Sequence, residues 1–478
     1  MDIVIEKLNE SYIKVKCENW LSMELSEIFS FTAPNFQFTP SFRNRLWDGK
    51  IRLFNRRNNT MYAGLLPKLL HYAKNEGYEV DGYLGPEIKS TESAQIEAWA
   101  ATLGLPGMTL RDYQTSSVQA AMAERKIIIS PTGSGKSLSL YLIYRHFNVK
   151  TLLIVPTVSL VKQMYSDLRE YGYEDDIDLI YGDADKPKGT QLTISTWQSI
   201  FRKPKSWFEK FHCVIGDEVH TFKANSLVSI MEKCEHAKYR IGLSGTLDDS
   251  KVNQLTLEGL FGEVITVTTT AELIEQKVLA DLKIQCLVMQ YPDHLRKIKR
   301  DYQTEMDFLV NCKERNQVIR KLVHKLDGNV LVLFQFVEKH GKELYEDIKR
   351  NTNRPVYYIS GEIKGDERER IRKEIDKEDN AILVASSGTT STGLNIVSLK
   401  HVVFTSPSKA KIKTLQSIGR ILRKSQSKTS AVLWDIADNL SWKNRKNYTL
   451  KHFLERINIY NREKFQYEVR KVNLNIKE

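Results

Sequence analysis

Residues Ser130–Ser137 read SPTGSGKS and directly follow the apolar run Ile127–Ile129. This order predicts a strand that enters a glycine-rich turn and then a helix. Glycines in the turn let backbone N–H groups converge on one point, which suits a triphosphate. Lys136 would reach the β- and γ-phosphates, and Ser137 would hold Mg²⁺. The residues of this candidate ATP-binding loop are Thr132, Gly133, Ser134, Gly135, Lys136 and Ser137.

Two adjacent acids, Asp217 and Glu218, follow the apolar stretch Cys213–Ile215. A phosphate-loop ATPase needs a second contact to Mg²⁺ from a carboxylate at the end of a strand, and Asp217 fits that place. Glu218 would orient the attacking water and take its proton. An isolated pair of acids is commonly a solvated turn, but the phosphate loop upstream favours the catalytic interpretation. Together the two motifs predict ATP hydrolysis.

Further side chains suited to a nucleotide site stand before and after these motifs. Gln114, ahead of the loop, carries an amide that can pair with both N6 and N7 of adenine. Ser244 and Thr246 close another apolar strand, and His220 could connect them to the ATP site through a hydrogen bond. A purely structural histidine is the competing interpretation of His220.

Residues Gln416–Arg423 read QSIGRILR and place Arg420 and Arg423 on the same side of a helix. Guanidinium groups at these positions would reach the γ-phosphate from a second domain, as arginine fingers do. Taken alone, the two arginines would be interpreted as a basic helix face.

In this order and spacing, the motifs resemble those of superfamily 2 helicases of the DExH type, over roughly residues 108–440. The segments Phe36–Arg43 and Trp47–Phe54 make the whole chain similar to the phage UvsW helicases. This resemblance implies an ATP-dependent DNA helicase that remodels forks and Holliday junctions in recombination, repair and replication restart. It implies ATP and Mg²⁺ as cofactors, branched, single-stranded or double-stranded DNA as partner, and a monomer in the host cytoplasm.

The resemblance also assigns roles to residues that match the family's motifs. Catalytic residues would be Lys136, Asp217, Glu218, Arg420 and Arg423. Nucleotide contacts beyond the loop would come from Arg111, Gln114, Gly393 and Asn395. Coupling residues would be His220, Ser244, Thr246 and Gln416. Strand contacts would come from Pro156, Thr157, Thr196, Trp197, Gln198, Ser360, Gly361 and Ser386, although Trp197 could equally be buried behind its strand.

The sequence departs from the family's pattern at four positions. Ser130 replaces the first glycine of the loop, and Gly245 stands where alanine is frequent. Ser386 replaces a threonine and keeps its hydroxyl, while Asn395 replaces an aspartate near the ribose and can still form a hydrogen bond. None of these changes removes a group that the chemistry needs.

Composition excludes several other classes of protein. Among the 478 residues, 41% are hydrophobic and 27% charged, as in ordinary globular proteins. No apolar stretch approaches the about 18 residues that cross a membrane, and the N-terminus is not a signal peptide. Five scattered cysteines exclude a zinc ribbon and a disulfide framework. The net charge of +12 suits a polyanionic partner.

Alternating strand-like and helical stretches predict an α/β fold with two tandem RecA-like parallel-sheet domains, a small mixed α/β N-terminal domain and a helical C-terminal tail. The predicted N-terminal DNA-binding domain spans residues 1–88, followed by a connecting helix and linker at 89–107. The two RecA-like lobes are predicted at 108–282 and 283–440, and a basic helical extension at 441–478.

The N-terminal domain contains a basic stretch with interleaved aromatic residues. Residues 43–57 hold six cations against the single acid Asp48, and Arg43, Arg45 and Arg52 are candidate contacts to duplex DNA near a branch. The competing interpretation is a hairpin whose aromatic residues form the domain's core and whose arginines face water.

Three other functions stay open at this stage. DExH motifs occur in RNA helicases as well as in DNA helicases, although the N-terminal resemblance favours DNA. A restriction-complex motor would need a separate nuclease partner. An ATP-gated clamp on nucleic acid is a third alternative, but it would not need the water-activating acid and the arginine fingers.

Overall fold

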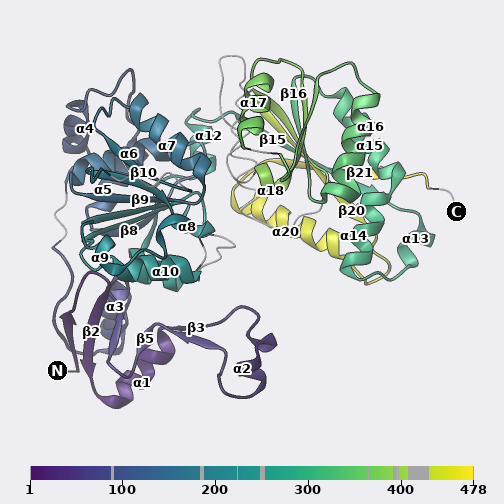
Figure 1. Cartoon of the computed structure of the whole chain (residues 1–478). Helices are drawn as coiled ribbons and strands as arrows, with labels where there is room; N and C mark the ends of the chain where they lie inside the picture. The colour runs from purple at the N-terminus through teal and green to yellow at the C-terminus, as the bar shows by residue number, and fades with distance from the viewer. Residues whose placement is uncertain are drawn as a thin grey trace. The chain divides into compact units, whose positions relative to one another are not determined.

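The computed structural model describes residues 2–87, 91–182, 188–222, 224–247, 253–363, 365–390, 396, 398–406 and 430–476. It divides into two compact units (Figure 1). The first comprises Met1–Ser130 and Gly135–Val267, and the second comprises Pro131–Ser134 and Thr268–Glu478. The first unit therefore contains both the N-terminal domain and the first parallel-sheet lobe.

The N-terminal domain is built on a five-stranded mixed sheet of order β5-β6-β2-β1-β7, in which only β7 runs parallel to its neighbour. Alternate residues of its strands, such as Ile3, Ile5, Ile13 and Val15, are buried against α1 and α3, as a one-sided sheet requires. Its elements are β1 (Ile3–Lys7), β2 (Tyr12–Cys17), α1 (Asn19–Ile28), β5 (Phe54–Asn55), β6 (Thr60–Tyr62), α3 (Leu66–Glu76) and β7 (Val80–Gly82).

A projecting arm, residues 30–52, leaves this domain between α1 and β5 (Figure 1). It consists of the antiparallel pair β3 (Ser30–Thr32) and β4 (Lys50–Arg52), with the short helix α2 (Pro40–Arg43) near its tip. The arm has its own small core, because the rings of Phe36 and Phe42 pack edge to face at 4.6 Å. Gly49, at φ 81°, completes it, since a Cβ there would lie 2.4 Å from the Phe36 ring.

The first lobe contains a seven-stranded, fully parallel sheet of order β10-β11-β9-β12-β13-β8-β14. Its strands are β8 (Arg125–Ile129), β9 (Thr151–Val155), β10 (Ile177–Ile180), β11 (Leu192–Thr196), β12 (Cys213–Asp217), β13 (Tyr239–Ser244) and β14 (Val264–Thr266). The helices are α4 (Ser93–Ala101), α5 (Asp112–Ala121), α6 (Lys136–Phe147), α7 (Val158–Glu170), α8 (Trp197–Ile200), α9 (Lys205–Phe208), α10 (Ala224–Lys233) and α11 (Gln254–Phe261).

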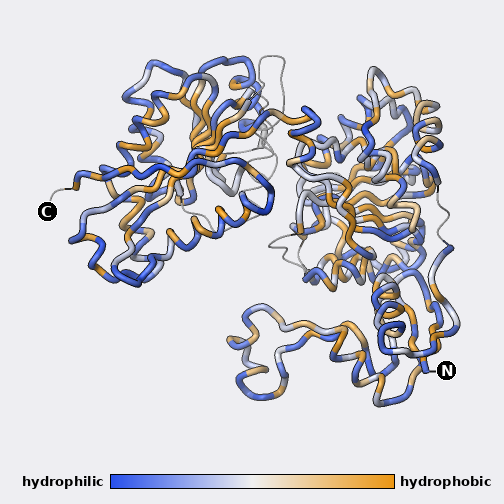
Figure 2. Tube along the Cα trace, turned by 180° about the vertical axis from the view of Figure 1, so that it is seen from behind, coloured by the Kyte–Doolittle hydropathy of each residue, from blue (hydrophilic) through white to orange (hydrophobic). Residues whose placement is uncertain are grey.

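Both faces of this sheet are covered. Leu153 and Val155 of β9 pack in one core cluster with α5, α6 and α7, while Leu152 and Ile154 pack in another with α10 and α11. Strands buried on both faces read as continuous apolar runs, which is why these segments were recognisable in the sequence. Figure 2 shows the hydrophobic residues following the strands of the sheets.

The second unit contains another seven-stranded parallel sheet, of order β17-β18-β16-β19-β20-β15-β21. Its strands are β15 (Asp281–Gln290), β16 (Asn329–Phe334), β17 (Val356–Ile359), β18 (Ile382–Ser386), β19 (Leu399–Phe404), β20 (Ser430–Asn439) and β21 (Tyr467–Asn473). The helices are α12 (Thr270–Glu275), α13 (Asp293–Lys297), α14 (Tyr302–Asn311), α15 (Lys313–Lys325), α16 (Lys342–Arg350), α17 (Gly365–Ile375), α18 (Ser387–Thr390) and α20 (Tyr448–Arg462).

The two parallel sheets and the mixed N-terminal sheet confirm the predicted fold class. The lobe boundary predicted at residue 282 falls inside β15, which begins at Asp281. The helix expected in the C-terminal tail is α20, and the chain then adds β21, which pairs in parallel with β15. None of the described helices combines the length and apolarity that crossing a bilayer requires.

A polar contact, here called the seat, fixes the N-terminal sheet against the first lobe. Its residues are Glu10, Ser11, Tyr12, Tyr62, Arg125, Glu232 and Arg240. The hydroxyls of Tyr12 and Tyr62 both donate to Glu232 Oε1, at 2.5 and 2.9 Å. Burial, together with the Glu232 carboxylate, raises the pKa of both tyrosines well above its ordinary value. Both hydroxyls therefore stay protonated and keep donating.

Arg240 lies at the centre of the seat and is 1% exposed. Its guanidinium donates to Ser11 Oγ at 2.8 Å and also to three main-chain carbonyls of the lobe. Beside it, Arg125 donates to Glu10 Oε2 at 2.7 Å. The backbones also approach closely, because a Cβ on Gly64 would lie 2.3 Å from the carbonyl oxygen of Glu258. The two domains are thus one packed body.

We expect Arg240→Met to lower the free energy of unfolding of the first unit by about 3 kcal/mol, because several buried acceptors would lose their donor. Chemical denaturation followed by tryptophan fluorescence would measure the loss. Arg202→Met, which changes an exposed arginine of the same lobe, should shift stability by no more than about 0.5 kcal/mol. Equal stability of the two variants would contradict the importance of the seat.

Candidate functional site

Three neighbouring strands of the first lobe end at one edge of the sheet. Ile129 of β8 pairs with Ser244 of β13, and Leu243 of β13 pairs with Asp217 of β12. Parallel strands carry their carboxyl ends to the same edge, where ligands bind in open α/β sheets. The backbone N–H of Ser130 donates to the carbonyl of Ser244 at 2.9 Å. The glycine-rich loop therefore starts beside the acids and the Ser244 segment.

The loop has the backbone geometry of an anion site. Gly133 and Gly135 have φ values of 89° and 83°, in the left-handed region that favours glycine. The 12-residue helix α6 begins at Lys136, so its unpaired N–H groups and positive dipole end face the loop. Thr132 is half-buried and Ser134 is buried within the same turn. This arrangement can cradle phosphate groups.

Gln114 lies next to this loop. It is 3% exposed, and a Cβ on Gly135 would lie 2.8 Å from its Nε2 atom. Its Oε1 accepts a hydrogen bond from the backbone N–H of Arg111 at 3.0 Å. The Arg111 guanidinium in turn donates to the hydroxyl of Tyr113 at 2.9 Å. The structure therefore brings the predicted adenine-reading amide to the loop, with its orientation fixed by the start of α5.

Lys136 and Glu218 form the central ion pair of the site. The Lys136 ammonium lies 3.3 Å from Glu218 Oε1 and donates to the carbonyl of Ser130 at 3.3 Å. Glu218 has φ 50°, a left-handed conformation that is uncommon outside glycine and often marks functional sites. Burial acts to raise the pKa of Glu218, but Lys136 and His220 outweigh it and hold the pKa below its usual value. Glu218 is therefore ionised at neutral pH.

Asp217 has the opposite electrostatic environment. Burial, and the adjacent Glu218 carboxylate, raise the pKa of Asp217 to about 7.

Ser137 places its hydroxyl 2.7 Å from the hydroxyl of Tyr171. A carboxylate and a hydroxyl are oxygen ligands of the kind that Mg²⁺ takes beside phosphates, where one or two protein groups suffice. In the described part of the chain, no cluster of three or more His, Cys, Asp or Glu residues could hold a metal.

A hydrogen-bonded relay connects the acids to the end of β13. His220 is 2% exposed, and its Nδ1 lies 2.6 Å from Ser244 Oγ and 3.4 Å from Glu218 Oε2. Ser244 Oγ donates to the carbonyl of Thr246 at 2.6 Å, so it accepts from a protonated Nδ1. The backbone N–H of Gly245 donates to Glu218 Oε2 at 3.4 Å. The structure therefore contains the hydrogen bond from His220 to Ser244 that was considered from the sequence, and the coupling role of this relay stays a prediction.

The residues predicted to contact a DNA strand from the first lobe lie together at the ends of β9 and β11. Gln198 donates through Nε2 to the carbonyl of Pro156 at 3.2 Å and is exposed. Thr157 caps α7, since its side chain accepts from the backbone N–H of Leu160 at 3.3 Å. Thr196 is buried, and Trp197 is half-buried against the lobe's core. Among these residues, Gln198 alone is exposed, while the others are half-buried or buried.

The residues predicted to contact DNA from the second unit lie at the ends of two paired β-strands. Ile359 of β17 pairs with Ala385 of β18, so the following residues Ser360 and Ser386 emerge at the same edge. Ser360 is 1% exposed, Ser386 is 7% exposed, and Gly361 is exposed. The predictions for Gly393, Asn395, Gln416, Arg420 and Arg423 fall outside the residues that the structure describes.

The basic residues of the arm fall into two groups. Arg52 pairs with both Glu27 and Asp48 at 2.6 Å, so its charge braces the root of the arm. Arg43 and Arg45 are exposed and make no ion pair among the described residues. The aromatic residues of this stretch also differ in burial, since Phe54 is buried while Phe42 and Trp47 are half-buried.

Sequence analysis did not identify several residues that support the site. Tyr171 contacts Ser137 from the end of α7, and no motif or periodicity marks it. The tyrosines of the seat and their acceptor Glu232 are also distant from one another in the chain. Gly245, whose backbone N–H donates to Glu218, is noted in the sequence only as a departure from the family's pattern.

Comparison with known proteins assigns each part of this architecture. Family models match residues 2–81 (DNA helicase UvsW, N-terminal), 107–249 (type III restriction enzyme, res subunit) and 314–425 (helicase conserved C-terminal domain). The ATP-dependent DNA helicase uvsW of Enterobacteria phage T4 is 34% identical, over 99% of this chain and 100% of its own length. The chain belongs to the UvsW helicase family.

A solved structure of the T4 protein and a more distant relative are also similar to this chain. The crystal structure of T4 UvsW matches with a TM-score of 0.53 and 33% identity, covering 99% of this chain and 100% of that one. The DNA 3'-5' translocase XPB2 of Sulfurisphaera tokodaii is 25% identical, over 72% of this chain and 84% of its own length. The family model that matches residues 2–81 shows that the likeness to UvsW includes the N-terminal domain.

We expect Glu218→Gln to slow ATP hydrolysis by roughly 10²–10⁴-fold, because the amide cannot take a proton from water. ATP binding should persist or tighten, since Lys136 would lose its competing carboxylate. Steady-state hydrolysis and a fluorescent-nucleotide titration would separate the two effects. Glu263→Gln, at an exposed carboxylate of the same lobe, is the control. Hydrolysis at the wild-type rate would exclude Glu218 as the base.

We expect Ser244→Ala to lower DNA strand separation per ATP hydrolysed by about fivefold, because the relay between His220 and Thr246 loses its middle hydroxyl. The rate of ATP hydrolysis should change less than the number of base pairs separated per ATP. Parallel measurement of phosphate release and strand separation gives that ratio. Ser139→Ala, another buried serine of this lobe, should leave it unchanged. If unwinding and hydrolysis fall in proportion, Ser244 does not couple them.

Proposed function

We propose that this protein is an ATP-dependent DNA helicase that remodels branched DNA, such as forks and Holliday junctions, in recombination, repair and replication restart. The observation that carries the proposal is the Lys136–Glu218 pair, 3.3 Å apart beside a left-handed glycine loop at the start of α6. The name of the T4 relative, an ATP-dependent DNA helicase, supports the choice of DNA. We further propose that it acts as a monomer in the cytoplasm of a phage-infected host.

The ion pair suggests how ATP would start the reaction. A triphosphate carries more negative charge than one carboxylate, so Lys136 would move from Glu218 to the phosphates. Glu218, released from Lys136, would then orient a water molecule and take its proton. Ser137 and Asp217 would hold Mg²⁺, which supplies neutralisation of charge on the phosphate oxygens. The remaining nucleotide contacts are proposed for Arg111, Gln114, Gly393 and Asn395.

Residues beyond the first lobe's loop complete the proposed cycle. Arg420 and Arg423 would stabilise the charge that develops on the γ-phosphate. Gln416, with His220, Ser244 and Thr246, would pass the state of the nucleotide to the strand contacts. Those contacts are proposed for the exposed and backbone groups at Pro156–Thr157, Thr196–Gln198, Ser360–Gly361 and Ser386. Contacts to phosphates would let the motor pass any sequence.

The N-terminal domain would hold DNA on the same body that binds ATP. The seat attaches it to the first lobe through Tyr12, Tyr62 and Arg240. Arg43 and Arg45 are the proposed phosphate contacts of this domain, because their charges are not neutralised by neighbouring acids in the described structure. Arg52 is a weaker candidate, since two carboxylates already pair with it.

The function is tested by ATP hydrolysis with a panel of nucleic acids at one salt concentration. The panel contains single-stranded DNA, linear duplex, a fork, a four-way junction and single-stranded RNA. We expect forked and four-way DNA to stimulate hydrolysis at least tenfold above the DNA-free rate, and Lys136→Ala to abolish it, by analogy with phosphate-loop enzymes. Equal or greater stimulation by RNA would overturn the DNA assignment. Hydrolysis without strand release would favour an ATP-gated clamp.

A further inference from the structure

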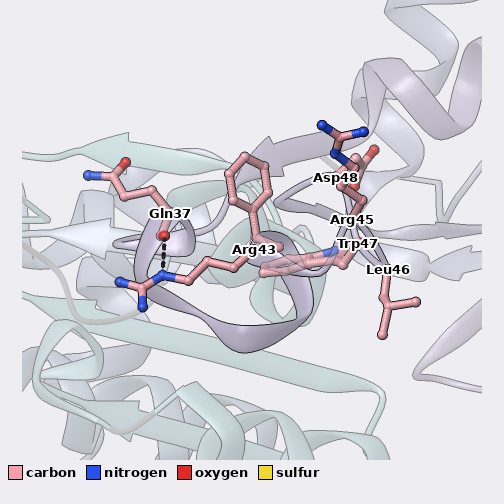
Figure 3. Close-up of a pocket in the computed structure, with 7 residues that line it drawn as sticks. Gln37, Arg43, Arg45, Leu46, Trp47 and Asp48 are labelled. Atoms are coloured by element: carbon pink, nitrogen blue, oxygen red, sulfur yellow. Dashed lines mark hydrogen bonds between the residues drawn. The ribbon is translucent and has the colours of Figure 1, made fainter.

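The tip of the arm carries an open groove of about 560 Å³, in which the proposed function assigns a role only to Arg43 and Arg45 (Figure 3). Its volume lies within the roughly 300–1,000 Å³ typical of small-ligand clefts. Seven residues line it: Gln37, Phe42, Arg43, Arg45, Leu46, Trp47 and Asp48.

The groove exposes apolar surface that the fold of the arm does not need. Leu46 is 81% exposed, and Phe38 nearby in the chain is 64% exposed. The arm is held instead by the Phe36–Phe42 ring contact and by Trp47, whose Nε1 donates to the carbonyl of Lys50 at 2.8 Å. Leu46 is held in place by its backbone N–H, which donates to the carbonyl of Ser41 at 2.9 Å. Its side chain is therefore available to a ligand.

The charges around the groove favour an anionic ligand. Its one acid, Asp48, is paired with Arg52, and this pairing first, then a backbone hydrogen bond from Lys50, lowers the pKa of Asp48 to about 2. Arg43 donates from Nε only to the carbonyl of Gln37, at 3.4 Å. Arg45 forms no ion pair among the described residues. The groove thus combines two cations with apolar side chains, which suits a nucleotide because it joins an apolar base to charged phosphates.

The root of the arm is also attached to the N-terminal domain by ion pairs. At its root, Glu27 of α1 pairs with both Lys50 and Arg52 at 2.6 Å. Exposed pairs of this kind contribute little stability individually, but these two both connect the arm to α1. The domain that carries the arm belongs to the same compact unit as the ATP-binding lobe.

We propose that the arm-tip groove binds one unpaired base of the DNA strand at a branch point, with Leu46 against the face of the base and Arg43 and Arg45 on the flanking phosphates. The proposal rests on the proposed function and adds a ligand class for this site. A paired base shows only its edges in the grooves of a duplex, so its face is accessible where pairing ends. The site therefore distinguishes a branch from continuous duplex without reading sequence.

A protein–DNA double-mutant cycle tests this inference. Binding is measured by fluorescence anisotropy, without nucleotide, on two forks that differ at the unpaired positions next to the branch. One fork carries ordinary bases there, and the other carries abasic residues. We expect the wild-type protein to bind the abasic fork about five- to tenfold more weakly, because an abasic residue removes the apolar face that Leu46 would cover. Leu46→Ala should bind both forks alike.

Matched variants separate this contact from general effects. Leu84→Ala, at another exposed leucine of the N-terminal domain, should keep the wild-type difference between the forks. Arg43→Gln with Arg45→Gln should weaken binding to both forks equally and reduce the salt dependence, because phosphate contacts do not sense the base. This pattern would assign base contact to Leu46 and phosphate contact to the arginines.

The inference is overturned if the wild-type protein binds the two forks equally, or if Leu46→Ala keeps the full difference. In either case, fork-stimulated ATP hydrolysis would still support the proposed function. If the wild-type protein shows neither fork binding above linear duplex nor stimulated hydrolysis, both proposals fail together. If Leu46→Ala weakens binding to both forks by the same factor and so keeps their ratio, Leu46 does not contact the base and the inference is also overturned.

Discussion

The parallel register of β8, β13 and β12 is the constraint on which the nucleotide site depends. It places Ile129 beside Ser244 and Leu243 beside Asp217, so the loop, the acids and the relay all leave the sheet at one edge. A slip by one residue would turn every side chain of a strand to the opposite face. Both faces are apolar, so packing opposes that slip: the side chains of each face fit a different core cluster.

The two neighbouring acids differ because one cation lies closer to one of them. Lys136 contacts Glu218, whose pKa is held low, while burial and the adjacent charge raise the pKa of Asp217 to about 7. Titratable neighbours whose pKa values are pushed apart are typical of sites with divided roles. The left-handed backbone at Glu218 keeps this division in place, since it turns the second carboxylate toward His220 and Gly245.

The sequence was sufficient for features that depend on local order. Apolar runs followed by the loop or by Asp217-Glu218 predicted the strands, the turn and the edge at which they meet. Contacts between distant residues were not predictable, as with Tyr171 at Ser137 or Tyr12 at Glu232, because no spacing rule connects them. Strand β21 was not predicted either, because its exposed, charged residues lack the alternation of apolar and polar residues that marks a half-buried strand. Roles given to Arg420 and Arg423 stay predictions.

The seat also limits how this protein can be rearranged. Many multidomain proteins join modules by linkers, so that a module can be exchanged without disturbing its neighbour. Here Glu232 accepts from two tyrosines of the other domain, and Gly64 leaves no room for a side chain against the lobe's backbone. A genetic exchange that replaced the N-terminal domain alone would have to reproduce those hydroxyls and that glycine. We therefore expect the N-terminal domain and the first lobe to be inherited together, as one evolutionary unit.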